Sequence, residues 1–138
     1  MKKIILLAVA LVSLATITSC SKDDDSASLQ GKWAVLQYGT LVNGQEVLED
    51  VVPDGDGCLQ DYTEITATNT ISHDFEDLGS GCEEIIGDPV PYTRDGNILT
   101  SSEGTAEIKS LTGSTLKIYS VENFGGTTST YISVFKRI

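Results

Sequence analysis

Turn-forming residues divide the chain from residue 29 onward into short segments, and this spacing limits the fold more than any other feature. Each segment holds about five to ten residues, and no window carries the i, i+3, i+4, i+7 apolar spacing of an amphipathic helix. Asp95-Gly96 is typical of a two-residue hairpin turn. We therefore predict an all-β chain with little helix, folded as an antiparallel barrel or sandwich. The other turns are Asn43-Gly44, Gly113-Ser114 and Gly125-Gly126.

The segments between these turns are rich in β-branched and aromatic residues, as strands are. Residues 45–60 differ, because they combine several carboxylates with Pro53, Gly55 and Gly57, and we predict a polar, acidic loop there. The predicted strands cover residues 29–38, 62–67, 70–75, 97–101, 105–110, 115–121 and 127–137.

The N-terminal segment has the pattern of an export signal. Lys2 and Lys3 precede an apolar run from Ile4 to Ile17, which is shorter than the roughly 20 residues that a membrane-spanning helix needs. The run ends in Ile17-Thr18-Ser19-Cys20, which resembles a lipobox: an aliphatic residue, two small residues and a cysteine. We predict that residues 1–19 are a lipoprotein signal peptide and that the Cys20 thiol is acylated. The alternative is an ordinary secretory signal followed by an incidental cysteine.

Residues 20–27 form a polar tether after the cysteine. Lys22 and the acidic run Asp23-Asp24-Asp25 should stay solvated, because they cannot pack into a core. The segment resembles the signal that exports lipoproteins to the cell surface in Bacteroidetes-type bacteria. The resemblance implies an outer-membrane protein that faces outward, and the alternative is a plain spacer in a periplasm-facing protein.

The charge of the chain limits its partners. Its formal net charge is −11, and removal of residues 1–19 takes away two lysines and no carboxylate. Such an acidic chain disfavours nucleic acid as a partner, and its membrane contact is expected through the lipid alone. We predict that residues 28–138 form a single domain, long enough to bury its own core.

Two further cysteines, Cys58 and Cys82, remain in an oxidising compartment, where a disulfide is expected. Metal binding is the alternative for these thiols. It is disfavoured, because His73 is the single histidine and no C-x-x-C spacing occurs. Residues 54–57 do not match a calcium loop, since Cys58 stands where an oxygen ligand is needed. We predict no metal and no cofactor.

Four segments together resemble the lipocalin-like lipoproteins of Bacteroidetes over residues 28–138. The first is Gly31-Lys32-Trp33, which corresponds to the G-x-W of lipocalins. Relatives usually carry a second tryptophan before the D-G hairpin, where this chain has Pro91-Tyr92, so the packing of that strand is open. The other matching segments are residues 92–100, 108–116 and 131–138.

The resemblance implies a small up-and-down β-barrel of about eight strands, closed at one end. Trp33 would pack at the closed end, beneath Arg137 or Lys136 of the last strand, and we favour this packing role over ligand contact. The other end would open to a cavity for a small apolar molecule, although the same side chains could simply fill the barrel. The candidate lining residues are Val35, Leu36, Ile65, Phe75, Leu99, Ile108, Ile118 and Phe135.

No catalytic constellation is found in the sequence, and we predict that the protein is not an enzyme. His73 and Asp74 are neighbours on a predicted strand, so they point to opposite faces and cannot pair, and we expect a solvated or loosely packed histidine. Two functions remain. One is a lipid-anchored module that binds a small apolar ligand. The other is an envelope protein that meets a protein partner through residues 45–60 and the disulfide-tied segment 58–82.

Overall fold

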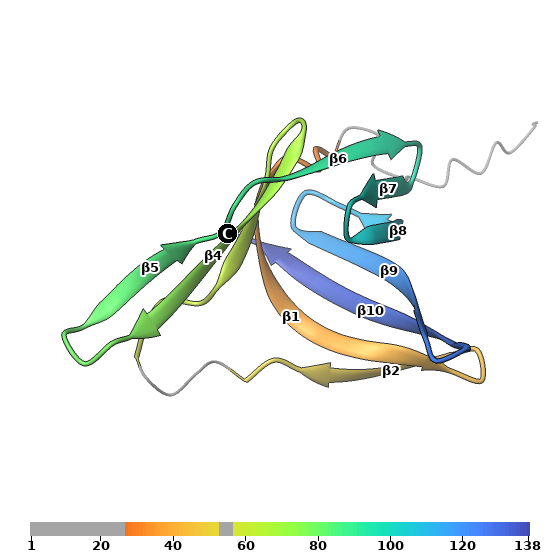
Figure 1. Cartoon of the computed structure of the whole chain (residues 1–138), viewed down its shortest axis with the longest axis horizontal. Coiled ribbons are helices and arrows are strands. Elements are labelled where there is room, and N and C mark those ends of the chain that lie inside the picture. The colour runs from red at the N-terminus through yellow and green to blue at the C-terminus, as the bar shows by residue number, and fades with distance from the viewer. Residues whose placement is uncertain (1–26, 53–56) are drawn as a thin grey trace, which may run out of the picture.

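A computed structural model describes residues 27–52 and 57–138 of the chain (Figure 1). These residues form strands and turns and no helix. In order along the chain the strands are β1 (Gly31–Val42), β2 (Gln45–Asp50), β3 (Tyr62–Ile65), β4 (Asn69–Asp77), β5 (Cys82–Ile86), β6 (Val90–Asp95), β7 (Ile98–Ser101), β8 (Gly104–Leu111), β9 (Thr115–Phe124) and β10 (Thr127–Arg137).

Eight of the strands close into an antiparallel barrel. The hydrogen-bonded order runs β10-β9-β8-β7-β6-β4-β3-β1, and β1 pairs with β10 to complete the circle. Strand β2 pairs with the C-terminal half of β1, and β5 pairs with β4. Both strands therefore lie off this circle. The prediction of a small up-and-down all-β barrel of about eight strands with little helix is therefore confirmed.

Beyond β6, which only the predicted hairpin turn after it implied, two strands form where the sequence pattern predicts none. Residues 45–50 form β2 instead of a loop, because Asn43 and Gly44 adopt φ values of 50° and 79° and join two strands by a tight turn. Residues 82–86 form β5 through pairing with β4. The hairpin turn near Asp95 lies at Gly96 and Asn97, since Asp95 pairs with Ile98 as the last residue of β6.

Three hairpins extend beyond the barrel, in two directions (Figure 1). Hairpin β4–β5 extends to one side, and the β1–β2 and β9–β10 hairpins extend together to the other. The barrel wall is weakest between β4 and β6, which pair through Asn69 with Pro91 and Thr70 with Val90. Most of β4 is instead paired with β3 and β5.

The described part of the chain has two buried groups on opposite faces of the sheet. Trp33 and Leu116 are fully buried within the barrel, with Leu29, Ile65 and Ile108 around them. Ile132 and Val134 alternate with inward-facing Phe135 along β10 and are buried on the other face, as is Ala34.

A group of polar side chains makes hydrogen bonds across the face that buries Ile132 and Val134. Glu46 of β2 accepts hydrogen bonds from Lys117 Nζ (2.8 Å) and from the Tyr119 hydroxyl, although β1 and β10 separate β2 from β9. The bonds from Lys117 and Tyr119 hold the pKa of Glu46 below its usual range, and the carboxylate raises the pKa of Tyr119. The start of β2 is thus tied to the first half of β9 across β1 and β10.

Candidate ligand-binding site

The register of β9, β10 and β1 defines the inner face of the barrel. Leu116, which is fully buried, pairs with Phe135, and Phe135 pairs with Val35. Every second residue from there lies on the same face. The inner face therefore continues along β10 through Ser133 to Tyr131, and Ser133 pairs with Tyr38 on β1.

One end of the barrel is closed by Trp33 and Arg137. The Trp33 indole N–H donates a hydrogen bond of 2.8 Å to the Leu29 carbonyl oxygen, and the Arg137 guanidinium lies 4.2 Å from the ring centroid. Arg137 also donates to the carbonyl oxygens of Gly113 and Gln30, both at 2.8 Å, and to that of Ser28. A cation over an indole contributes about 0.5–2 kcal/mol. Arg137, rather than Lys136, occupies this position.

The glycine of the G-x-W motif is explained by the same contact. Gly31 has a φ of 145°, and a Cβ atom built there would lie 2.2 Å from Arg137 Nη1. A side chain at this position would displace the guanidinium from its hydrogen bonds to the carbonyl oxygens of Gln30 and Ser28. The glycine and the tryptophan of the motif therefore act together, since Gly31 leaves the space in which Arg137 covers Trp33.

Five of the eight predicted lining residues fill the closed end rather than an open cavity. Ile65 and Ile108 belong to the buried core, and Leu99, Ile118 and Phe135 pack against it. Val35 is partly buried and faces inward opposite Phe135.

The other two predicted lining residues lie away from this cluster. Leu36 occupies the bulge between Val35 and Gln37 and is 39% exposed. Phe75 lies on the opposite face of β4 from Thr70, which pairs with buried Ile65, and its ring is 6.1 Å from that of Tyr62. The structure thus corrects the placement of Phe75 in the barrel interior.

The opposite end of the barrel leaves its inner face open to solvent. Tyr38 is 55% exposed and Tyr131 is 40% exposed, although both lie on the face that buries Leu116 at the other end. On the strand beside Tyr131, its partner Ser120 lines a hollow of about 240 Å³ together with Ala106, Glu103 and Glu122. Sequence reasoning missed Tyr38 and Tyr131, although the alternation of Tyr131, Ser133 and Phe135 carried the signal for the second.

A larger hollow of about 490 Å³ lies at the closed end, outside the core. It is lined by residues 27–30 and by Ala67, Tyr92, Thr93 and Arg94. Tyr92 stands where relatives are expected to carry tryptophan, and its hydroxyl donates a hydrogen bond of 2.8 Å to the Thr66 carbonyl oxygen. Tyr92 also packs against the core, so the open question about this strand is answered.

Comparison with solved structures finds lipocalins. The siderocalin Ex-FABP, described as functioning through dual ligand specificities, superposes with a TM-score of 0.45 at 14% identity, over 79% of this chain and 69% of its own. A dog lipocalin allergen superposes with a TM-score of 0.42 at 15% identity, over 80% and 74%. No protein-family model and no curated protein sequence matches the chain. The barrel assignment rests on the strand pairing within this chain.

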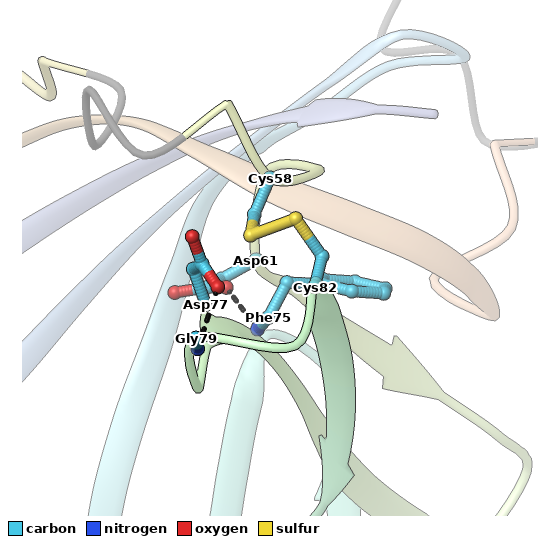
Figure 2. Close-up of a disulfide and its surroundings, with 6 residues drawn as sticks. All are labelled: Cys58, Asp61, Phe75, Asp77, Gly79 and Cys82. Carbon is cyan, nitrogen blue, oxygen red and sulfur yellow. Dashed lines mark hydrogen bonds between the residues drawn. A yellow bond between two sulfur atoms is a disulfide. The ribbon is translucent and has the colours of Figure 1, made fainter.

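The disulfide lies between the loop before β3 and the start of β5 (Figure 2). Cys58 and Cys82 are joined, with a Cα–Cα distance of 5.5 Å. Close to it, the Asp61 carboxylate accepts a hydrogen bond of 2.7 Å from the Phe75 backbone N–H, and Asp77 accepts one of 2.8 Å from Gly79. The disulfide and the Asp61 contact attach the β4–β5 hairpin to the segment before β3, and the Asp77 contact lies within the turn of the hairpin.

His73 is more enclosed than the sequence suggested. It is 7% exposed, stacks on Tyr62 at 4.3 Å between ring centroids, and lies between two carboxylates. Its Nδ1 is 2.7 Å from Glu84, and its Nε2 is 3.4 Å from Glu64 without a hydrogen bond. The expectation of a solvated or loosely packed histidine is wrong, because β3 and β5 pair on either side of β4 and cover it.

Several expectations fall outside what the structure describes. Residues 1–19, Cys20 and most of the tether lie there, as do residues 54–56 of the rejected calcium pattern. Within residues 27–52 and 57–138, no group of three or more acidic, histidine or cysteine side chains is arranged to hold a metal ion. In the same ranges no helix has the length and apolar character to cross a bilayer.

Proposed function

We propose that the barrel binds one small apolar molecule through its open end, and that Cys20 anchors it to the bacterial envelope. The observation that supports binding is the unequal filling of one continuous face. This face is packed around Trp33 and Leu116 at one end and exposes Tyr38 and Tyr131 at the other. An eight-stranded barrel is just wide enough to hold one small ligand when its side chains do not fill it. Nothing in the described residues assembles a nucleophile and a base, so the proposal is non-catalytic.

Ligand binding is tested with the neutral fluorescent probe N-phenyl-1-naphthylamine. We expect a saturable rise in fluorescence with the wild-type chain. Ser133→Trp should weaken binding at least about tenfold, because Ser133 lies on the inner face between Ile118 and Tyr38 and an indole there would fill the opening.

The matched control is Thr100→Trp. Thr100 alternates with Leu99, which packs on the core, and is therefore exposed on the outer face of β7. The Thr100→Trp variant should bind the probe as tightly as the wild type does. Equal binding by Ser133→Trp and the wild type would place the probe elsewhere and contradict the proposal.

We further propose that the mature protein begins at acylated Cys20 and lies at the outer membrane, facing outward. The lipobox and the acidic tether of residues 20–27 support this location. Wild-type protein should incorporate a labelled fatty acid in growing cells and Cys20→Ala should not, because the Cys20 thiol carries the acyl chains that attach the protein to the membrane. Ser21→Ala, which leaves the thiol in place, should be labelled as strongly as the wild type.

Orientation is tested by treating intact cells with protease. Digestion of the domain on intact cells is the expected result. Survival of the domain, while a known surface protein is cut, would favour the periplasm-facing alternative.

A protein partner is the second candidate function, and the β4–β5 hairpin favours it. This hairpin extends from the barrel and exposes Leu78, Ile85 and Ile86 at 58%, 44% and 60% (Figure 1). Exposed apolar side chains on a disulfide-anchored projection are suited to contact with another envelope protein. Cross-linking from this hairpin in intact membranes, with Ile86→Asp as the comparison, distinguishes a partner from a small ligand at the barrel opening.

A further inference from the structure

The open end of the barrel carries a flat group of apolar and aromatic side chains, which we call the open-end face: Tyr38, Val42, Val47 and Tyr131. Thr40 pairs with Tyr131 on one side and with Val47 on the other, so the group crosses three adjacent strands. Tyr38 and Tyr131 are diagonal neighbours across β1 and β10, within reach of one ligand. All four side chains are between 40% and 55% exposed.

Carboxylates flank this face. Glu49 pairs with Tyr38, and Glu122 lies on the same side of β9 as Ser120, which pairs with Tyr131. Glu122 also lines the 240 Å³ hollow together with Glu103. In the described part of the chain, none of these three carboxylates forms an ion pair.

The lysines nearest to this end are engaged on the opposite face. Lys117 pairs with Glu46 at 2.8 Å, and Lys109 pairs with Glu107 at 2.8 Å while lying over the Tyr119 ring. Tyr119 pairs with Ile132 and therefore faces away from Tyr131. The opening thus combines exposed tyrosine rings with unpaired negative charge and has no cation of its own among the described residues.

We propose that the ligand of this site is an organic cation, an apolar body that carries an ammonium group. The apolar body would lie over Val42 and Val47 and in the barrel opening, and the ammonium group between the two tyrosine rings and Glu49 or Glu122. Aromatic faces attract ammonium groups, and carboxylates do so through charge. A fatty carboxylate would meet like charge at the same place. This inference rests on the proposed binding function and specifies its ligand class.

The experiment compares three ligands with the same twelve-carbon chain below their micelle concentrations: dodecyltrimethylammonium, dodecanol and dodecanoate. Each competes with N-phenyl-1-naphthylamine for the mature chain carrying Cys20→Ala, expressed without residues 1–19 so that neither the apolar run nor a lipid is present and no detergent is needed. We expect dodecyltrimethylammonium to bind at least about tenfold more tightly than dodecanoate at low salt. The ratio should fall as salt is added, because the carboxylates are exposed and screened.

Two sets of variants assign the effect to named groups. Glu49→Gln with Glu122→Gln should bring the affinities for the cation and the carboxylate close together, while dodecanol binding stays unchanged. Glu76→Gln with Glu83→Gln is the control, since it removes the same charge from the distant β4–β5 hairpin, where the two residues pair. Tyr38→Leu with Tyr131→Leu should weaken cation binding several-fold relative to dodecanol. Thermal melts confirm that each variant is folded.

Different results would contradict the organic-cation proposal and the proposed binding function. If dodecanol and dodecanoate bind as tightly as the cation, the barrel binds apolar molecules and the organic-cation proposal is overturned. If the neutral probe and all three ligands fail to bind, the proposed function itself is wrong. If the chain is a dimer in solution and Tyr131→Asp separates it, the open-end face is an interface between copies and the inference also fails.

Discussion

Trp33→Ala is expected to lower the free energy of unfolding by about 3–5 kcal/mol, the largest single-residue effect in this protein. The Trp33 side chain is fully buried and contacts the core from the centre of the closed end. Its loss would leave a cavity, remove the indole hydrogen bond to Leu29 and leave Arg137 without the ring beneath it. Urea denaturation followed by circular dichroism measures the change. Since a domain of this size has a total stability of about 5–15 kcal/mol, this loss is a large fraction of the total.

Tyr38→Ala is the matched control for this prediction. Tyr38 lies on the same strand as Trp33 and is also aromatic, but it is 55% exposed. Its truncation should change the free energy of unfolding by no more than about 1 kcal/mol. A wild-type denaturation midpoint for Trp33→Ala, or an equal loss for both variants, would contradict the assignment of Trp33 to a packed closed end.

Cys58→Ser combined with Cys82→Ser is expected to cost roughly 3–4 kcal/mol of stability, the second large effect. The two cysteines are separated by 24 residues, and opening a loop of this length releases chain entropy in the unfolded state. The loop contains β3 and most of the β4–β5 hairpin, which the barrel holds through short pairings. Urea denaturation of the double variant, with and without reductant, measures the loss.

The reductant is the control for the disulfide prediction. It should destabilise the wild type by about as much as the double substitution does and should leave the double variant unchanged. Probe binding at the open end should persist in the folded variant, because the disulfide lies by β5, away from the β1–β2 and β9–β10 hairpins (Figure 1). A reduced wild type as stable as the oxidised one would contradict a stabilising role.

The sequence pattern predicted the strands whose turns are encoded locally. Asn43-Gly44 and Gly125-Gly126 have positive φ values and join adjacent strands as expected. The pattern failed at β2 and β5, because both are polar or exposed segments that become strands through pairing with one edge of a longer strand. Their residues carry little hydrophobic alternation, so only the partner strand reveals them.

Some predicted site residues could be placed from local sequence, and others depended on strands that are distant in the chain. Trp33 and Arg137 could be placed from the motif at the start and the basic end of the last strand, and the structure brings them within 4.2 Å. The environment of His73 could not be predicted, because its neighbours Glu64 and Glu84 come from two other strands. The cavity residues were predicted from their apolar character, which does not distinguish a packed core from an open barrel end.

The sequence by itself determined an antiparallel all-β chain with short hairpins, two cysteines suited to a disulfide and an acidic charge, because turn chemistry, alternation and composition are local properties. Only the tertiary structure decided that β1 meets β10, that β2 and β5 lie off the barrel, and that one inner face is packed at Trp33 and open at Tyr38 and Tyr131. These features depend on the register between strands far apart in the chain. Register is set by the closure of the whole barrel, and no single segment encodes it.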